Sequence, residues 1–233
     1  PTWTSPTTLG CTGCHGFPPP APHVQLDTCE NCHTNYDGAG GFVDPSLHVN
    51  GTVNVVTGCV ACHGSGSQPA PPKDLSGGLT NTSPGVGAHS AHLNGGGGRS
   101  VPVTCDECHV VPTSIESPGH IDGWDRAELT FKSNSVIDAF AGADGYAPPG
   151  APTYDAATQT CTNTWCHGQD LGTPSPTWTT TGPLPCNGCH AMPPPLSQGH
   201  PNNTNCVLCH SSVVDAAKNI IDPTLHINGT VDF

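Results

Sequence analysis

The sequence is poor in the residues from which an ordinary globular core is built. Only 34% of its 233 residues are hydrophobic, that fraction includes 14 cysteines, and aromatic residues make up just 5%. Glycine and proline are abundant instead, with 29 and 26 copies, and such a composition lies near that of chains that stay disordered. We therefore expect something other than aliphatic side chains to fill the interior, and we predict that the bare polypeptide is disordered.

Positive charge is scarce as well. Five Lys and Arg residues stand against 18 Asp and Glu, so the formal net charge is -13 at pH 7. Nucleic acid and anionic membrane surfaces would repel such a chain, whereas cationic or metallic partners would attract it. No apolar run approaches the roughly 18 residues that a membrane-spanning helix needs. The chain begins at Pro1 without a signal peptide, and we expect it to be a mature or excised form of an exported protein.

What the sequence does contain is a repeated Cys-Cys-His pattern. All 14 cysteines fall into seven pairs, and a histidine follows the second cysteine of each pair. Six pairs are separated by two residues and one by four. This form is typical of c-type haem attachment, in which both sulfurs form thioethers with haem vinyl groups and the adjacent histidine ligates the iron. The motifs are Cys11/Cys14/His15, Cys29/Cys32/His33, Cys59/Cys62/His63, Cys105/Cys108/His109, Cys161/Cys166/His167, Cys186/Cys189/His190 and Cys206/Cys209/His210.

Two other uses of the cysteines fit this pattern less well. A disulfide framework has no need of a histidine after every second cysteine. A structural zinc site needs four ligands from two such pairs, so an odd number of pairs would leave one without a partner. Seven covalently attached haem c groups account for every cysteine.

The remaining histidines match the motifs in number. Seven lie outside the motifs, so each iron can have one proximal and one distal imidazole, and Met192 is the only alternative sulfur ligand. This balance predicts six-coordinate, bis-histidine iron throughout. The predicted distal ligands are His23, His48, His89, His92, His120, His200 and His226.

An internal repeat divides the chain. Pro1-Thr-Trp-Thr recurs at Pro176, and Asp44-Pro-Ser-Leu-His48 recurs as Asp222-Pro-Thr-Leu-His226. We predict a two-haem unit A at 1–55, a three-haem unit B at 56–175 and a second unit A at 176–233. The A-B-A order fits either part of a longer A-B array or a chain whose duplicated end binds another subunit. His23 should correspond to His200, and His48 to His226.

The predicted fold is mostly irregular coil with short helices and small hairpins, wrapped around a stacked chain of haems. Alternating apolar residues around Asn-Gly predict tight hairpins at 47–53 and 225–231. Short helices are expected at 124–131 and 213–220, with a single turn at each motif, and the glycine run 95–98 is expected to be a flexible loop. His89 and His92 are three residues apart, so one helical turn could present both to neighbouring haems.

Bis-histidine ligation restricts the chemistry. With both axial positions filled, the iron has no open site for a substrate, which leaves one-electron transfer and predicts that the protein is not an enzyme. A multihaem reductase would instead need an open or exchangeable axial site. Seven motifs in 233 residues leave too little polypeptide to insulate the haems, so they should pack in contact.

Several segments resemble a known family. The Cys-His-Gly triplets, the four-residue spacer of 161–167, and the segments 71–77, 83–92 and 225–232 are similar to the multihaem cytochromes of metal-reducing bacteria that mix CxxxxCH and CxxCH repeats. The resemblance covers nearly the whole chain. It implies export through the periplasm, an extracellular or outer-surface location, and electron transfer in long repeated arrays.

A looser resemblance concerns assembly. The chain is similar to cytochromes that polymerise into extracellular filaments, or nanowires, whose bis-histidine haems are stacked through subunits joined head to tail. We expect copies of the chain to bind head to tail, with cross-subunit donation of a terminal histidine such as His23 or His226 as one option. Other cytochromes or metal oxides would be the redox partners. The alternative is a soluble or surface-attached electron shuttle that docks on the same partners.

Overall fold

The structure is a computed structural model in which most, but not all, of the chain is described. Four predicted ligating residues, His23, Cys62, Cys166 and Cys189, lie outside the described residues, and so does the side chain of Cys11. The described residues are 11–20, 29–55, 58–61, 63–66, 68, 70–71, 74, 76–114, 117–120, 127–132, 150–164, 167, 176–180, 184–188, 190–196, 199–228 and 230–233.

The chain divides into two compact units. The first consists of Pro1–Gly77 and Pro112–Ala127, and the second of Gly78–Val111 and Glu128–Phe233. Each unit therefore combines segments that are distant in sequence. These bounds differ from those of the repeat, and the A-B-A division at 1–55, 56–175 and 176–233 stays a prediction about the sequence.

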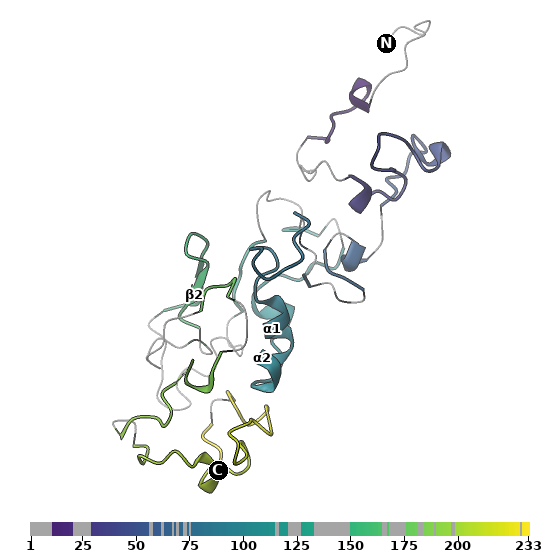
Figure 1. The fold of residues 1–233 in the computed structure, drawn as a ribbon. Helices are drawn as coiled ribbons and strands as arrows, with labels where there is room; N and C mark the ends of the chain where they lie inside the picture. Colours follow the sequence, from purple (N-terminus) through teal and green to yellow (C-terminus); the bar gives the residue numbers. More distant parts are fainter. Residues whose placement is uncertain are drawn as a thin grey trace, which may run out of the picture. The chain divides into compact units, whose positions relative to one another are not determined.

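Irregular coil and short turns make up most of both units (Figure 1). The longest helix among the described residues, α1, covers only His89–Leu93, and no described helix has the length and apolar character needed to cross a membrane. The prediction of a coil-rich chain with short helices is confirmed. A 3-10 turn begins at the first cysteine of every two-residue-spacer motif, as predicted: Cys11–Gly13, Cys29–Asn31, Cys59–Ala61, Cys105–Glu107, Cys186–Gly188 and Cys206–Leu208.

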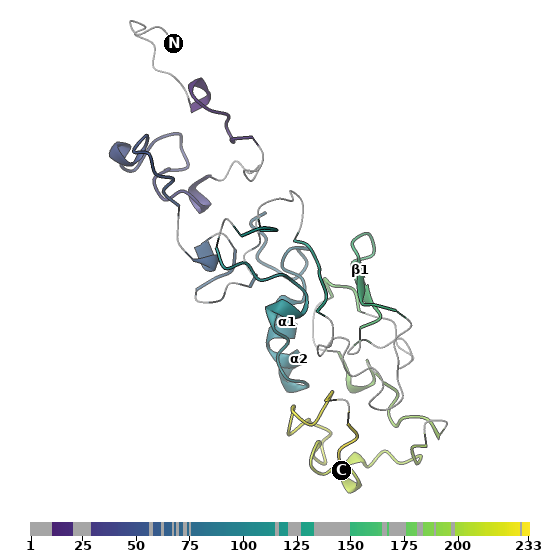
Figure 2. The same ribbon diagram turned by 180° about the vertical axis from the view of Figure 1, so that it is seen from behind.

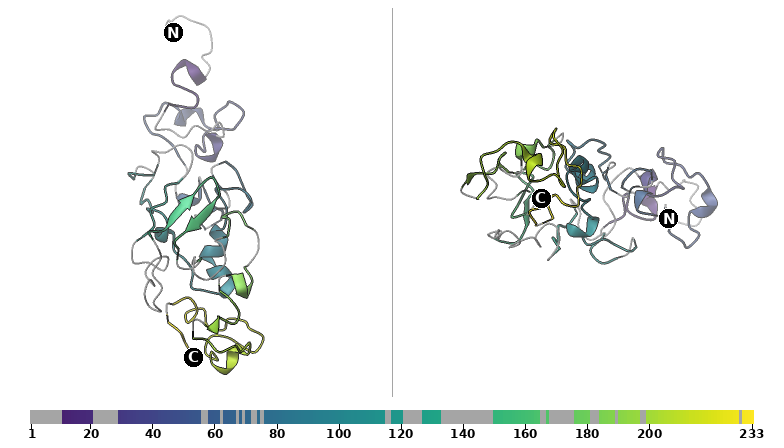
Figure 3. Two further views of the ribbon diagram at one scale, coloured as in Figure 1. Left: turned by 90° about the vertical axis from the view of Figure 1, so that its left-hand side faces the viewer. Right: turned by 90° about the horizontal axis from the view of Figure 1, so that it is seen from below.

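The motif with the longer spacer begins differently. Its first cysteine, Cys161, lies in strand β2 (Thr160–Thr162), which pairs antiparallel with β1 (Thr153–Asp155) so that Tyr154 faces Cys161. The two strands lie side by side in Figure 3, and β1 is labelled in Figure 2. An extended strand rises about 3.3 Å per residue, so Cys161 does not begin a 3-10 turn as the first cysteines of the other six motifs do.

The hairpins predicted at 47–53 and 225–231 are wrong, since the described residues of these segments contain no strand. In the first, Pro45–Leu47 forms a 3-10 turn, whose preceding Asp44 accepts hydrogen bonds from the backbone and hydroxyl of Ser46. The Asn50 side chain then accepts from Thr52 N, which closes a local turn instead of a ladder. Side chains that bond their own backbone nearby compete with strand pairing.

The second copy has the same arrangement. Asp222 accepts from the backbone and hydroxyl of Thr224, and the Asn228 side chain accepts from Thr230 N. The residue after each distal histidine also has a positive φ, 64° for Val49 and 60° for Ile227. This conformation is rare for β-branched residues. Its occurrence in both copies shows that the repeat keeps the same backbone conformation after His48 and His226.

The predicted helices are also replaced by turns. Within 213–220, the Asp215 carboxylate accepts from the backbone of Ala217 and Asn219, and Val214 pairs with Ile220 in an isolated bridge. The described part of 124–131, which begins at 127, is coil. In the first repeat copy Asp37 accepts from Ala39 and Gly41 in the same way as Asp215.

The glycine run forms a tight turn where a loop is expected. This segment, α2 (Gly95–Gly98), follows α1 directly and has positive φ at all four residues, from 59° to 86°. Only glycine adopts this left-handed conformation without steric cost. Gly95 is buried, and a side chain there would collide with the carbonyl of Ser100. The turn ends at Arg99, whose carbonyl is used at one of the histidine sites.

Apolar burial is slight. Val86 and Val213 are the only described apolar residues with less than a tenth of their surface exposed. Other apolar side chains near the histidines are exposed to solvent: Val49 at 90%, Leu196 at 71% and Phe233 at 74% of their surface. The polypeptide alone therefore builds no conventional core in the described residues, as the composition predicts.

Candidate metal centres formed by histidine pairs

Three of the motif turns share one pattern of backbone hydrogen bonds. The carbonyl of Cys29 accepts from the backbone of Cys32 and His33, and the carbonyl of Cys206 accepts from Cys209 and His210. Cys105 does the same for Cys108 and His109. Residues three and four apart on one turn are neighbours, so each of these turns brings the second cysteine and the histidine close to the first cysteine.

The histidine side chains are held in one tautomer. In ten of them Nδ1 lies within hydrogen-bonding distance of a backbone carbonyl, and because a carbonyl only accepts, Nδ1 carries the proton. The lone pair of Nε2 is then available to a metal ion, which is the usual arrangement of ligating histidines. The carbonyls belong to Gly16 for His15, Asn54 for His33, Val86 for His89, Ala88 for His92, Glu128 for His109, Ser114 for His120, Ala191 for His190, Pro201 for His200, Asp232 for His210 and Arg99 for His226.

Five motif histidines lie opposite five of the predicted distal histidines. Every pair has one member that follows a cysteine and one that does not, and every pair lies within a single compact unit. The ring centroids are separated by 6.5 Å for His15 and His48, 6.2 Å for His109 and His89, 6.0 Å for His167 and His92, 6.5 Å for His190 and His226, and 6.3 Å for His210 and His200.

These separations fit two imidazoles that share one iron. A metal-bound imidazole nitrogen lies about 2 Å from a first-row metal ion and about 1.2 Å from its own ring centroid. Two imidazoles on opposite sides of one ion therefore have centroids about 6.4 Å apart. The observed range of 6.0 to 6.5 Å brackets that value, and the thiols beside each motif histidine supply the attachment points. The residues present thus fit haem c.

The angles between paired rings fall into two groups. The rings of His89 and His109 are inclined by 22°, and those of His200 and His210 by 11°. The other three pairs are close to perpendicular: 68° for His15 and His48, 70° for His190 and His226, and 79° for His92 and His167. The first and second of these are repeat counterparts, and their near-equal angles show that the two copies build the same site.

From the sequence alone we expect His23, the nearest downstream histidine, to be the partner of His15. Among the described residues, the ring opposite His15 is that of His48. His23 itself lies outside the described residues. Sequence proximity is a poor guide here because the turn at Pro45–Leu47 carries His48 back to the first motif. In the second copy His226 and His190 repeat this long-range pairing.

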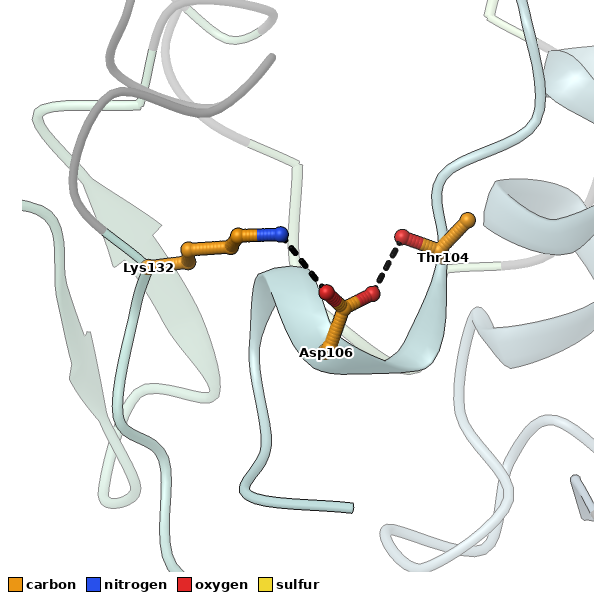
Figure 4. Close-up of polar contacts among 3 residues, drawn as sticks. All are labelled: Thr104, Asp106 and Lys132. Carbon is orange, nitrogen blue, oxygen red and sulfur yellow. Dashed lines mark hydrogen bonds and ion pairs between the residues drawn. The ribbon is translucent and has the colours of Figure 1, made fainter.

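The fourth motif is secured by a segment that follows it. Thr130 N and Lys132 N donate to the carbonyls of Cys108 and Glu107, while His109 Nδ1 donates to the Glu128 carbonyl. Figure 4 shows Asp106 between Lys132 Nζ at 2.6 Å and the Thr104 hydroxyl at 2.6 Å. These contacts lower the pKa of Asp106, the hydrogen bond from Lys132 being the largest cause. The ion pair is exposed, so the backbone bonds are what orient His109.

Burial keeps several of the imidazoles uncharged. It lowers the pKa of His167 to about 4, with a smaller contribution from His92, and it lowers the pKa values of His92 and His226 as well. A histidine must be neutral to bind a metal ion through Nε2. At neutral pH these side chains are therefore in the ligating form.

Aromatic contacts to the histidines were missed by sequence reasoning. Phe42 stacks on His48 at 4.0 Å, Phe233 stacks on His210 at 5.2 Å, and Trp178 contacts both His89 and His92. The repeated Pro-Thr-Trp-Thr at 176–179 was the available signal for Trp178, but no pattern in the sequence indicates what its ring touches.

Less is shown for the other predicted ligands. Cys14, Cys59, Cys105, Cys161, Cys186, Cys206 and Cys209 form no disulfide. His33, His63 and His120 all belong to the unit made of Pro1–Gly77 and Pro112–Ala127. Met192 is 39% exposed. No group of three or more His, Cys, Asp or Glu side chains is arranged as a metal cluster within the described residues.

Comparison with known proteins identifies no relative: no family model matches the chain, and neither a curated protein nor a solved structure is significantly similar to it.

Proposed function

We propose that the chain carries seven covalently attached haem c groups and transfers electrons through them. The observation that supports this most directly is the set of five motif-to-distal histidine pairs with ring centroids 6.0 to 6.5 Å apart. A disulfide or zinc role for the cysteines gives no reason for an imidazole from elsewhere in the chain to face each motif histidine across that gap.

When bound, haem supplies reversible one-electron chemistry at its iron. The chain's own residues would hold it through the two cysteine sulfurs of a motif and through two neutral imidazoles. Nδ1 protons on carbonyls such as those of Glu128 and Arg99 hold the rings in place and increase the basicity of Nε2. Two imidazoles per iron exclude water and substrates from the axial positions, which favours electron transfer over catalysis.

The repeat extends the pairing to two further centres. His210 faces His200, and their counterparts in the first copy are His33 and His23, so we assign His23 to the second motif. Of the seven motif histidines only His63 is then unassigned, and His120 is the one remaining distal histidine. Both lie in the unit formed by Pro1–Gly77 and Pro112–Ala127, which supports their pairing. All seven centres would then be completed within one chain.

The exposed apolar side chains support haem as the core of the fold. Leu196, Val49 and Phe233 are mostly exposed although each lies near a ligating histidine in sequence or space. Porphyrin faces beside them would cover this surface, and covalent attachment allows a chain of low apolar content to retain its cofactors.

We propose further that the chain is a subunit of an extracellular filament in which copies bind head to tail. Its low apolar content, net charge of -13 and repeated A unit favour such an array with cationic or metallic acceptors. Intramolecular pairing of His226 with His190 removes the need for cross-subunit donation of that residue. A shuttle that docks on cytochromes or metal oxides is the second candidate.

Haem content and electron paramagnetic resonance (EPR) test the primary proposal. Seven covalent haems per chain with only low-spin iron are expected in the oxidised protein. Fewer than seven covalent haems would refute the assignment, and a high-spin signal would favour a reductase with an open axial site. Electron microscopy of concentrated holoprotein distinguishes the two forms of assembly, because filaments are expected for the first and discrete particles for the shuttle.

A further inference from the structure

Helix α1 carries two imidazoles that serve two different centres. His89 faces His109 of the fourth motif and His92 faces His167 of the fifth, although the two residues are only one helical turn apart. Side chains three apart on a helix are neighbours, with Cβ atoms about 5 to 6 Å apart. The two irons that these histidines would bind are therefore adjacent in the array.

One indole contacts both of these imidazoles. The ring of Trp178 meets His89 edge to face, with centroids 4.8 Å apart and an angle of 84°. The same ring stacks on His92 at 5.6 Å and 22°. Aromatic contacts of this kind restrict the rotation of the rings involved. Trp178 is thus placed to control the plane of both distal ligands.

Trp178 is itself held from several sides. Its indole Nε1–H donates to the Pro84 carbonyl at 2.8 Å, and its backbone N–H donates to the Gln159 carbonyl at 2.6 Å. The neighbouring Thr179 hydroxyl donates to the Gln159 side chain at 2.7 Å. Anchored in this way, the indole can transmit its position to the histidines rather than adapt to them.

The segment before α1 is shaped to admit the indole. Gly87 is buried with a φ of 43°, and any side chain at this position would overlap the Trp178 ring. Glycine is the residue that permits such close approach. The adjacent Val86 is one of the two buried apolar residues among those described, and its carbonyl accepts the hydrogen bond from His89 Nδ1. Indole, glycine and imidazole thus form one packed group.

We propose that Trp178 is a positioning residue that sets the ligand planes of two neighbouring haem centres at once. It holds the His89 ring at an angle of 22° to the His109 ring, and the His92 ring at an angle of 79° to the His167 ring. The proposal rests on haem binding at the fourth and fifth motifs. A tryptophan is required because its ring is large enough to reach both imidazoles and its N–H can fix the ring to Pro84.

The mutual angle of two axial imidazoles has a spectroscopic consequence. Parallel imidazoles donate π-electron density into the same iron d orbital and separate the two upper d orbitals of the π set, which gives a rhombic low-spin EPR signal. Perpendicular imidazoles donate into both orbitals and leave them nearly equal in energy, which gives a signal with a larger maximum g value. The fourth and fifth centres should therefore contribute one signal of each type.

The experiment uses the haem-loaded protein with Trp178→Phe and Trp178→Leu. His89→Ala and His92→Ala first assign the two signals, because each removes one. Both Trp178 variants should keep seven haems and all iron low-spin, while the g values of both assigned signals shift and the others stay unchanged. Trp3→Phe, the same change in the other Pro-Thr-Trp-Thr copy, should leave both assigned signals in place.

The outcomes separate this inference from the proposed function. Absence of covalent haem would refute haem binding itself. Full haem content with both assigned signals unchanged in Trp178→Phe, or with only one of them shifted, would refute the positioning role alone. If Trp178→Leu loses haem, the result for Trp178→Phe decides whether the positioning role holds, because phenylalanine preserves most of the ring volume. Equal shifts in Trp3→Phe would also refute a specific role for Trp178.

Discussion

Removing a distal histidine should change one iron centre and reveal the angle at which its ligands were held. His226→Ala and His200→Ala act in the same repeat copy but on centres of different geometry. The rings of His226 and His190 are inclined by 70°, whereas those of His200 and His210 are inclined by 11°. The two substitutions should therefore remove different low-spin EPR signals.

The expected magnitude follows from the ligand count. With seven haems bound as proposed, each variant would remove one of fourteen axial ligands, so one of seven irons, about 14% of the total, should lose its low-spin state. Covalent haem content should remain at seven because the thioethers are untouched. His226→Ala should remove a signal with a large maximum g value, and His200→Ala a rhombic signal. The reason is that near-parallel rings separate the iron d orbitals and near-perpendicular rings do not.

The assay is quantitative EPR of the oxidised holoprotein at neutral pH, together with a haem determination. His48→Ala provides a matched comparison, since His48 and His15 are inclined by 68° and should yield the same type of loss as His226→Ala. The pairing is refuted if His226→Ala leaves every iron low-spin, or if His200→Ala and His226→Ala remove the same signal. Loss of several haems from one variant would refute the assumption that the centres are independent.

Three further predictions concern other parts of the chain. Replacing Cys161 by serine should reduce the attachment of the fifth haem and leave six haems with two thioethers each, as mass spectrometry of tryptic peptides can show. Lys132→Ala breaks only an exposed ion pair with Asp106, so the EPR spectrum and thermal midpoint should be unchanged; a shift of the fourth centre would contradict the view that backbone bonds orient it. Hydrogen bonds, from Gly41 first for Asp37 and from Asn219 first for Asp215, lower both pKa values below the ordinary 3.8. Their stabilisation is complete above that ordinary pKa and is lost as the pH falls through the lowered folded-state pKa values, so denaturant titrations should find the double Asp→Asn variant less stable at pH 7, with a difference that shrinks as the pH is lowered through the acid range.

The turns around the motifs could be predicted from the sequence because they depend on local spacing. Two cysteines three apart and a histidine four after the first fit one 3-10 or helical turn, and a turn forms at all six motifs with that spacing. The hairpin prediction at 47–53 failed for an equally local reason. Asp44 and Asn50 bond their own backbone, and this competition outweighs the alternating apolar pattern.

The sequence by itself determines which residues are available as ligands: fourteen cysteines in seven pairs, fourteen histidines in two equal sets, and a repeat that relates His48 to His226. Only the tertiary structure decides which histidines face each other. The pairs of His15 with His48, and of His190 with His226, span segments whose separation in sequence carries no information about the path between them. Ring angles, and the placement of Trp178 between His89 and His92, depend likewise on contacts between distant segments. Local patterns specify turns and potential ligand atoms, whereas contacts between segments distant in sequence specify which of these ligands are paired.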